Sequence, residues 1–233
     1  MIQPKRKQIQ LSELLNYLAL VDGENAKIPS LQELSNELNL SVASLREQLA
    51  VGRSIGVIEA RPRTGLKKLP YSFAPAVRES VSYAIVTSPA YFEKYADLRR
   101  HIEGSYWLQA VQLLTPEDIK KMDALVDQAI TKLGGKPIQI PHREHRQLHM
   151  ITFSHIENEF VIGLLEAYWD FYEAVGLDRY TEFDYLEEVW HYHKSMVEAI
   201  RSGNFEEGYK AMAIHMDLIN LRYNQIGSKQ KFE

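Results

Sequence analysis

Apolar residues recur at helical spacing through nearly the whole sequence after Pro89, and this pattern constrains the fold more than any other feature. Thr115 and Pro116, followed by two acidic residues, are typical of a helix start. The connections between the helical segments are short, which favours antiparallel neighbours. We therefore predict an all-α antiparallel bundle of about six helices. Their expected bounds are 91–114, 116–133, 142–154, 159–175, 183–201 and 205–226.

The composition limits the class of protein. The chain has 233 residues, is 45% hydrophobic and 25% charged, and so has the composition of an ordinary globular protein with a core. It lacks a run of about 18 apolar residues that would predict a transmembrane helix, and its polar, basic beginning is unlike a secretory signal. With no cysteine, it has neither a disulfide framework nor a thiolate metal site. We expect a cytoplasmic protein without a membrane partner.

Charge is distributed unevenly along the chain. Residues 1–70 hold ten Lys and Arg against seven Asp and Glu, a net charge of +3, whereas the remainder holds 17 against 24, a net charge of −7. The excess is concentrated in residues 42–70, with six basic and two acidic residues. A basic segment joined to an acidic body suggests an anionic polymer that binds at one end only. An ordinary solvated surface explains the charge alone equally well.

The first part of the sequence predicts three short helices. An apolar stripe falls within 9–20, and a second at 31–38 follows Ser30 and Glu33, which form a capping box. After a short turn, a third helix is expected over about 42–52. Two short helices joined by such a turn form a helix-turn-helix, whose second helix can enter the DNA major groove. That helix would expose Ser44, Arg46, Gln48 and Arg53.

A basic hairpin is expected next. Residues 55–60 favour a strand, 61–65 a turn and 66–69 a return strand, so this segment predicts a two-stranded wing suited to phosphates or the minor groove. The plainer alternative is a small helical subdomain with a hairpin. Residues 68–78, with two prolines, predict an extended connection, and 79–87 the beginning of a helix. The expected domains are a winged helix-turn-helix at 1–72, a linker at 73–88 and the helical domain at 89–228.

Three motifs follow one another between residues 28 and 69. They are P-S-x-x-E-L-S-x-x-L-x-L-S, then L-R-E-Q-L, then I-G-V-I-E-A-R-P-R-T-G. Their order resembles the DNA-binding domain of the GntR family of bacterial winged-helix regulators. The resemblance implies that Arg46 approaches bases or phosphates in the major groove, and that the wing around Gly65 lies against the minor groove.

The start of the third helix departs from that family. Val42, Ala43 and Ser44 stand where the family commonly has Arg, Thr and Pro, so an operator sequence cannot be transferred. The resemblance and the exposed positions together give a set of expected DNA-binding residues. These are Ser41, Ser44, Arg46, Arg53, Arg61, Arg63, Thr64, Gly65 and Lys67.

A histidine-rich stretch runs from His142 to His149. In a helix, His145 and His149 are four residues apart and lie on one face. Neutral imidazole is a common ligand of zinc-like metals, and such a pair can coordinate one ion. Two histidines do not complete a site, so further ligands must come from other segments.

Three stretches of the helical part resemble the FCD ligand-sensing domain found in the FadR branch of GntR regulators. Residues 98–103 are similar to R-R-x-x-E, and residues 145–149 with Asn158 to D-x-x-F-H followed by N. Residues 193–204 are similar to H-x-x-I-x-x-A-I-x-x-G-D, and residues 211–215 to A-M-x-x-H. The resemblance covers about 91–226.

In metal-binding members of that family, one Asp or Asn and three His hold a divalent ion. The resemblance places His149, His193 and His215 at the three His positions and His145 at the Asp position. A neutral set of four nitrogens favours zinc, nickel or copper over manganese or magnesium, and we expect zinc or nickel. The uncompensated +2 charge would be balanced by an anionic effector.

Arg99 is the expected effector-binding residue, because the family's first bundle helix faces the cavity and arginine binds carboxylates through two hydrogen bonds. The alternative is a surface ion pair with Glu103, four residues later.

Together these features predict a transcription regulator that binds a palindromic operator in double-stranded DNA as a homodimer. A small carboxylate, bound at or near the metal, would control operator affinity. One alternative is a regulator of the same fold that binds an acyl or sugar-acid ligand without metal. A metal-dependent hydrolase is a further alternative, but HExxH is absent and Glu144 falls on another helix face from His145 and His149, so we expect no enzyme.

Overall fold

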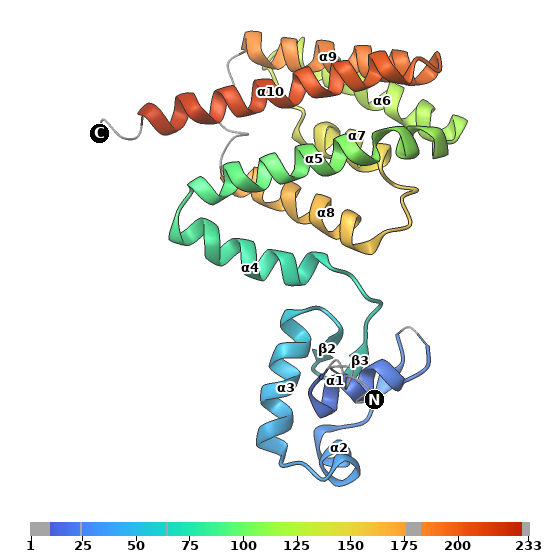
Figure 1. Cartoon of the computed structure of the whole chain (residues 1–233), viewed down its shortest axis with the longest axis vertical. Helices are drawn as coiled ribbons and strands as arrows, with labels where there is room; N and C mark the ends of the chain where they lie inside the picture. The colour runs from blue at the N-terminus through green and yellow to red at the C-terminus, as the bar shows by residue number, and fades with distance from the viewer. Residues whose placement is uncertain (1–9, 24, 64, 176–182, 230–233) are drawn as a thin grey trace, which may run out of the picture. The chain divides into compact units, whose positions relative to one another are not determined.

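The computed structural model describes residues 10–23, 25–63, 65–175 and 183–229. Within them the chain forms ten helices and a three-stranded antiparallel sheet (Figure 1), which confirms the predicted mainly α fold. The chain divides into two compact units, residues 1–79 and 80–233, and each is described by itself. In these described parts, no helix has the length and apolar character needed to cross a membrane.

The first unit is a winged helix-turn-helix. Its helices are α1 (Glu13–Leu20), α2 (Leu31–Leu38) and α3 (Val42–Ser54). Its strands are β1 (Lys27–Ile28), β2 (Ile58–Arg61) and β3 (Gly65–Lys68), in the order β1-β3-β2. Leucine and isoleucine side chains from all three helices and all three strands form one core.

Local hydrogen bonds explain where α2 and α3 begin. The Ser30 hydroxyl accepts from the Glu33 amide at 3.3 Å, and the Glu33 carboxylate accepts from the Ser30 amide at 2.7 Å, as a capping box requires. Asn39 adopts a left-handed conformation at the end of α2. The Ser41 hydroxyl then accepts from the Ser44 amide and starts α3.

The wing differs from the predicted hairpin by a third strand. Residues 58–61 pair with 65–68 as expected, with Arg61 opposite Gly65. In addition, β1 pairs with β3 and buries Ile28. Two residues are too few to produce the alternating pattern by which a strand is recognised in a sequence.

The predicted extended connection at 68–78 is wrong for its second half. The helix α4 runs from Ala74 to Thr87 and therefore begins well before residue 79. Pro75 occupies its first turn, where a missing N–H costs no helical hydrogen bond. The Ser72 hydroxyl accepts from the Ala74 amide, which stabilises this start.

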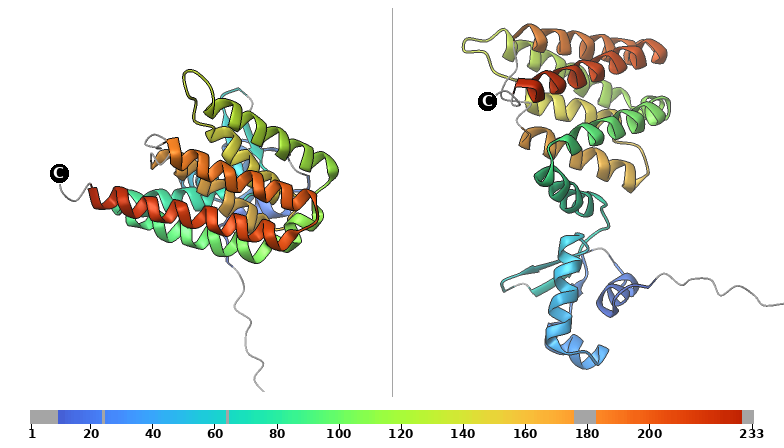
Figure 2. Two further views of the ribbon diagram at one scale, coloured as in Figure 1. Left: turned by 90° about the horizontal axis from the view of Figure 1, so that it is seen from above. Right: turned by 60° about the vertical axis from the view of Figure 1, so that its left-hand side comes forward.

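The second unit contains the six expected bundle helices. They are α5 (Ala90–Leu113), α6 (Pro116–Leu133), α7 (His142–Thr152), α8 (Glu159–Ala174), α9 (Phe183–Arg201) and α10 (Phe205–Lys229). Helix α10 packs along both α9 and α5, and α7 packs between α6 and α8 (Figures 1 and 2). The short helix α7 thus has its inward face enclosed by longer helices.

Gly56 is a position where the backbone admits only glycine. It follows α3 with φ of +75°, and a Cβ atom there would lie 2.5 Å from Cγ of Pro75. We predict that Gly56→Ala lowers the free energy of unfolding of the winged unit by about 2–5 kcal/mol, because left-handed strain and overpacking add. Far-UV circular dichroism during chemical denaturation measures this change.

Gly23→Ala is the matched control. Gly23 has φ of +85° but nothing within 4 Å of an added Cβ, so only the strain of about 1–2 kcal/mol is expected. The three tryptophans all lie after residue 100, and their fluorescence transition should change in neither variant. Equal losses of stability in the two variants would contradict the role of Pro75.

Candidate metal centre

The structure brings four histidines together inside the bundle. His145 and His149 lie one turn apart on α7, and α9 and α10 contribute His193 and His215. Each has no more than 6% of its surface exposed. The helical spacing on α7 puts both of its imidazoles on the buried face, as predicted.

The Nε2 atoms of these residues are separated by the distances that a small ion needs. His145 and His215 are 3.2 Å apart, His149 and His193 3.2 Å, and His149 and His215 3.3 Å. A tetrahedral ion with Zn–N bonds of about 2.0–2.1 Å separates its ligands by about 3.3–3.4 Å. Three of the six separations therefore match those of a tetrahedral divalent ion, and all four donor atoms lie within 4.8 Å of one another.

Burial keeps the four imidazoles uncharged. It holds the pKa of His145, His193 and His215 well below the ordinary value, and neighbouring imidazoles and the Arg99 guanidinium lower it further. Burial and Arg99 also lower the pKa of His149, partly opposed by Glu103. A neutral imidazole has one nitrogen lone pair to offer, so the electrostatics suit a metal ligand.

Aromatic side chains enclose the cluster. The ring centroid of Trp169 lies 4.8 Å from that of His145 and 5.1 Å from that of His149, and Trp190 lies 4.7 Å from His193. Tyr172 packs edge-on against His145. These rings fix the imidazole planes by packing and remove water from around them. The sequence contains these aromatic residues without indicating which of them would line the site.

Behind His149 lies a buried ion pair. The Arg99 Nε donates to Glu103 Oε1 at 2.7 Å, and Arg99 Nη2 lies 2.9 Å from His149 Nδ1. Burial raises the pKa of Glu103, but Arg99 and His149 outweigh it and hold the pKa at about 2. The Arg99–Glu103 pair was considered in the sequence only as a surface contact. Its i, i+4 spacing is the right signal, yet spacing does not reveal burial.

A second ion pair orients α7. Lys132, in the last turn of α6, binds both carboxylate oxygens of Glu144 at 2.8 Å. Glu144 is buried and faces α6, whereas His145, the next residue, faces the cluster. The carboxylate beside the histidines is therefore held away from them, as expected from its helix face.

Other histidines lie apart from the cluster. His191 is exposed on α9, and His155 contacts Asp118 at the start of α6. His101 is exposed and contacts Asp97. His142 and His145 both line a hollow of about 10 Å³ beside Trp190, which is too small for a metabolite.

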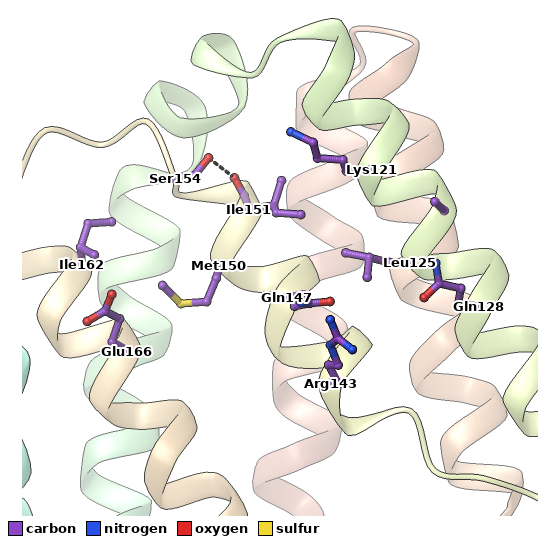
Figure 3. A pocket seen from close by; sticks show the side chains of 11 residues that line it. Lys121, Leu125, Gln128, Arg143, Gln147, Met150, Ile151, Ser154, Ile162 and Glu166 are labelled. Carbon is purple, nitrogen blue, oxygen red and sulfur yellow. Dashed lines mark hydrogen bonds between the residues drawn. The ribbon is translucent and has the colours of Figure 1, made fainter.

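A much larger pocket lies on the other face of α7. Its volume is about 670 Å³, and it is open to solvent between α6, α7 and α8. Figure 3 shows Arg143, Gln147 and Met150 of α7 facing it, with Lys121 of α6 and Glu166 of α8 on its walls. None of the four clustered histidines lines this pocket.

The expected DNA-binding residues lie on α3 and on the wing. Arg46 and Arg53 are exposed on α3, Ser44 is half-buried, and the Ser41 hydroxyl caps the helix. Arg63 lies in the turn of the wing, with φ of +69°. At the strands, Arg61 forms an ion pair with Glu59, Gly65 is exposed and Lys67 is half-buried opposite Glu59. Thr64 lies outside the described residues.

Gln48 is not an exposed residue of α3, contrary to expectation. Its Oε1 accepts from the Leu14 amide at 2.8 Å, and its Nε2 donates to Glu13 at 2.9 Å. Gln48 therefore satisfies the free amide at the start of α1, a contact between residues 34 positions apart that a local pattern does not reveal.

Comparison with known proteins agrees with this architecture. The FCD domain family matches residues 95–218, which include all four clustered histidines and Arg99. A structure of Streptococcus agalactiae GntR has a TM-score of 0.60 at 15% identity, over 90% of this chain and 95% of that one. No curated protein matches the sequence.

Two further solved structures are similar over most of their length. A GntR-family transcriptional regulator from Pseudomonas syringae has a TM-score of 0.43 and 17% identity, over 94% of this chain and 84% of that one. Escherichia coli McbR/YncC has a TM-score of 0.44 and 17% identity, over 90% of each chain. Because the family match spans more than half of the sequence, the chain belongs to the FCD-domain family.

Proposed function

We propose that the protein is a DNA-binding transcription regulator whose operator affinity is controlled by a small carboxylate at a divalent metal. His145, His149, His193 and His215 hold the ion, which is zinc or nickel. One observation carries this proposal: four neutral, buried imidazoles converge within an FCD domain, with their donor atoms within 4.8 Å of one another. Uncharged polar groups are otherwise costly to gather in an apolar core.

The charge of the site explains why an anion would bind there. Four neutral ligands leave the +2 charge of an ion uncompensated, and the charge of Glu103 is already offset by Arg99. A divalent ion supplies a positive centre that attracts a carboxylate. Arg99, through its guanidinium, provides the second attraction for the same group.

The winged unit supplies the DNA contacts. The exposed side of α3 carries Arg46 and Arg53, and the wing carries Arg61 and Arg63 on exposed positions. Arginines on a helix and on an adjacent hairpin suit the major groove and the flanking phosphates, respectively. A homodimer would bind a palindromic operator, because two-fold operators mirror two-fold proteins.

Two other functions have weaker support. A regulator without metal would use the open pocket at α6, α7 and α8, but this leaves the buried histidines unexplained. A hydrolase needs a carboxylate base near the ion, and Glu144 is bound to Lys132 while Glu103 is bound to Arg99. A hydrolase would also leave the winged unit without a role.

Removal of one histidine should abolish metal binding. We predict that protein purified without a histidine tag binds about one zinc per chain. His193→Ala should weaken zinc binding by more than about a hundredfold, because losing a direct ligand should reduce the affinity more than losing a residue that only contacts a ligand. Chelator competition measures the affinity. His191→Ala, two residues away and exposed, is the matched control and should bind normally. Zinc contents below about a tenth of an equivalent in the wild type would contradict the metal site.

Acid should destabilise the metal-free bundle. The four imidazoles have pKa values lowered by burial in the folded chain, whereas the unfolded chain takes up protons at about pH 6.5. Stability is therefore complete above that pH and decreases as the pH falls through it, by up to about 1.4 kcal/mol per pH unit for each imidazole. Denaturation followed by tryptophan fluorescence measures this slope. His215→Phe should reduce it and His191→Ala should not.

Arg46 should contribute to operator binding. We predict that Arg46→Ala weakens binding to DNA from upstream of the protein's own gene by about tenfold or more and reduces the dependence on salt. Gel shifts at several salt concentrations measure both effects. Arg100→Ala removes an arginine from α5 and should leave DNA binding unchanged. Absence of footprints upstream of its own and neighbouring genes would refute the proposed regulator.

A further inference from the structure

One ring nitrogen of His149 faces two groups with opposite requirements. Its Nδ1 lies 2.9 Å from Arg99 Nη2 and 3.5 Å from Glu103 Oε2. A guanidinium only donates hydrogen bonds, and an ionised carboxylate only accepts them. Nδ1 must therefore carry a lone pair to bind Arg99 and a hydrogen to bind Glu103, and it cannot do both.

The shorter of the two distances shows that His149 Nδ1 is hydrogen-bonded to Arg99 rather than to Glu103 in this structure. Glu103 uses Oε1 for Arg99 Nε, while its Oε2 is buried and has no hydrogen-bond partner among the described residues. A buried carboxylate oxygen without a donor is costly. An acceptor for a hydrogen on Nδ1 is thus already present, and the hydrogen is held elsewhere.

The other end of the ring shows where that hydrogen lies. A neutral imidazole carries one hydrogen, so a ring that accepts from Arg99 at Nδ1 has its hydrogen on Nε2. That atom faces the Nε2 atoms of His193 and His215. A nitrogen that carries a hydrogen has no lone pair for a metal. His149 therefore cannot act as a neutral Nε2 ligand while Arg99 holds its Nδ1.

We propose that His149 exchanges Arg99 for Glu103 when the metal site is filled. This inference rests on the metal site proposed above. In the exchange, Nε2 gives its hydrogen to water that enters with the hydrated ion and Nδ1 takes one from the same water, so the ring stays neutral. Glu103 Oε2 then accepts from Nδ1, as carboxylates do behind metal-bound histidines. Arg99 keeps its Nε bond to Glu103 Oε1.

The exchange makes Arg99 available only in the metal-loaded protein. Its guanidinium lies over the rings of Tyr168 and Trp169, with centroid distances of 4.4 and 4.7 Å, and these contacts hold it beside the cluster. Once His149 no longer accepts from Nη2, that donor faces the site without its former partner. Arg99 could therefore bind an anion only after the metal has bound, so the metal must bind first and the anion second.

The wild-type protein provides the direct test. Long-range proton–nitrogen spectra of full-length protein with ¹⁵N-labelled histidine report which ring nitrogen carries hydrogen, and His149→Gln identifies the His149 signals. We expect the hydrogen on Nε2 in metal-free protein and on Nδ1 after one equivalent of zinc. A hydrogen on Nδ1 in both states would overturn the exchange. If zinc does not bind, the metal site and the exchange both fail; if zinc binds and the hydrogen does not move, the exchange alone fails.

Variants of the pair provide a second test through zinc affinity. Arg99→Met removes the competing donor and should strengthen zinc binding several-fold, whereas Glu103→Gln should weaken it by about ten- to a hundredfold. A pair with only a structural role would weaken binding in both variants, and that result would overturn the proposal. Arg100→Met, at an adjacent and more exposed arginine, and Glu198→Gln, on the surface of α9, are the matched controls.

The double variant addresses failure of a single variant to fold. Arg99→Met combined with Glu103→Gln removes both charges of the buried pair, which avoids leaving one of them uncompensated. It should bind zinc about tenfold or more weakly than Arg99→Met, because His149 has lost its charged acceptor. Equal affinities of these two variants would exclude a role for Glu103.

Discussion

The bundle depends on keeping four imidazoles uncharged inside an apolar core. A protonated imidazole among the side chains around Trp169 and Trp190 would lack water, and the carboxylate beside the cluster, Glu103, is already paired with Arg99. Burial prevents protonation by lowering the pKa, but it leaves ring nitrogens that still need partners. The Nδ1 atoms of His193 and His215 have none among the described residues. The fold therefore holds the cluster in a state that is stable in packing and incomplete in hydrogen bonding.

The Arg99–Glu103 pair sets the chemistry of that cluster. Both side chains are buried on α5, so neither charge is weakened by solvent. Breaking such a pair is more costly than forming it is favourable, and its geometry is consequently rigid. Because the pair presents both a donor and an acceptor to one nitrogen of His149, the position of the hydrogen on the imidazole determines which of the two groups is left without a partner.

Much of this architecture could be predicted from the sequence, because its signals are local. The capping box at Ser30, the stripe of α6 and the i, i+4 histidines of α7 each depend on neighbouring residues. The features that the sequence did not predict depend on residues far away in the chain. Strand β1 exists because it pairs with β3, and Gln48 is partly buried because it accepts a hydrogen bond at the start of α1. Arg99 was predicted as an effector-binding residue, but its i, i+4 spacing to Glu103 fits an ion pair on the surface and an ion pair in the core equally well.

The substitution of histidine for the expected aspartate is the feature with the greatest consequence. An aspartate at position 145 would bring a negative charge to the ion, whereas His145 brings none. With Glu103 already paired, an occupied site in this chain would retain the ion's full charge in a core of low polarity. Such a site favours entry of an anion more strongly than a site with its own carboxylate ligand. In the regulator proposed above, the neutral ligand set would thus make occupation by metal and by carboxylate interdependent, as a sensor of both requires.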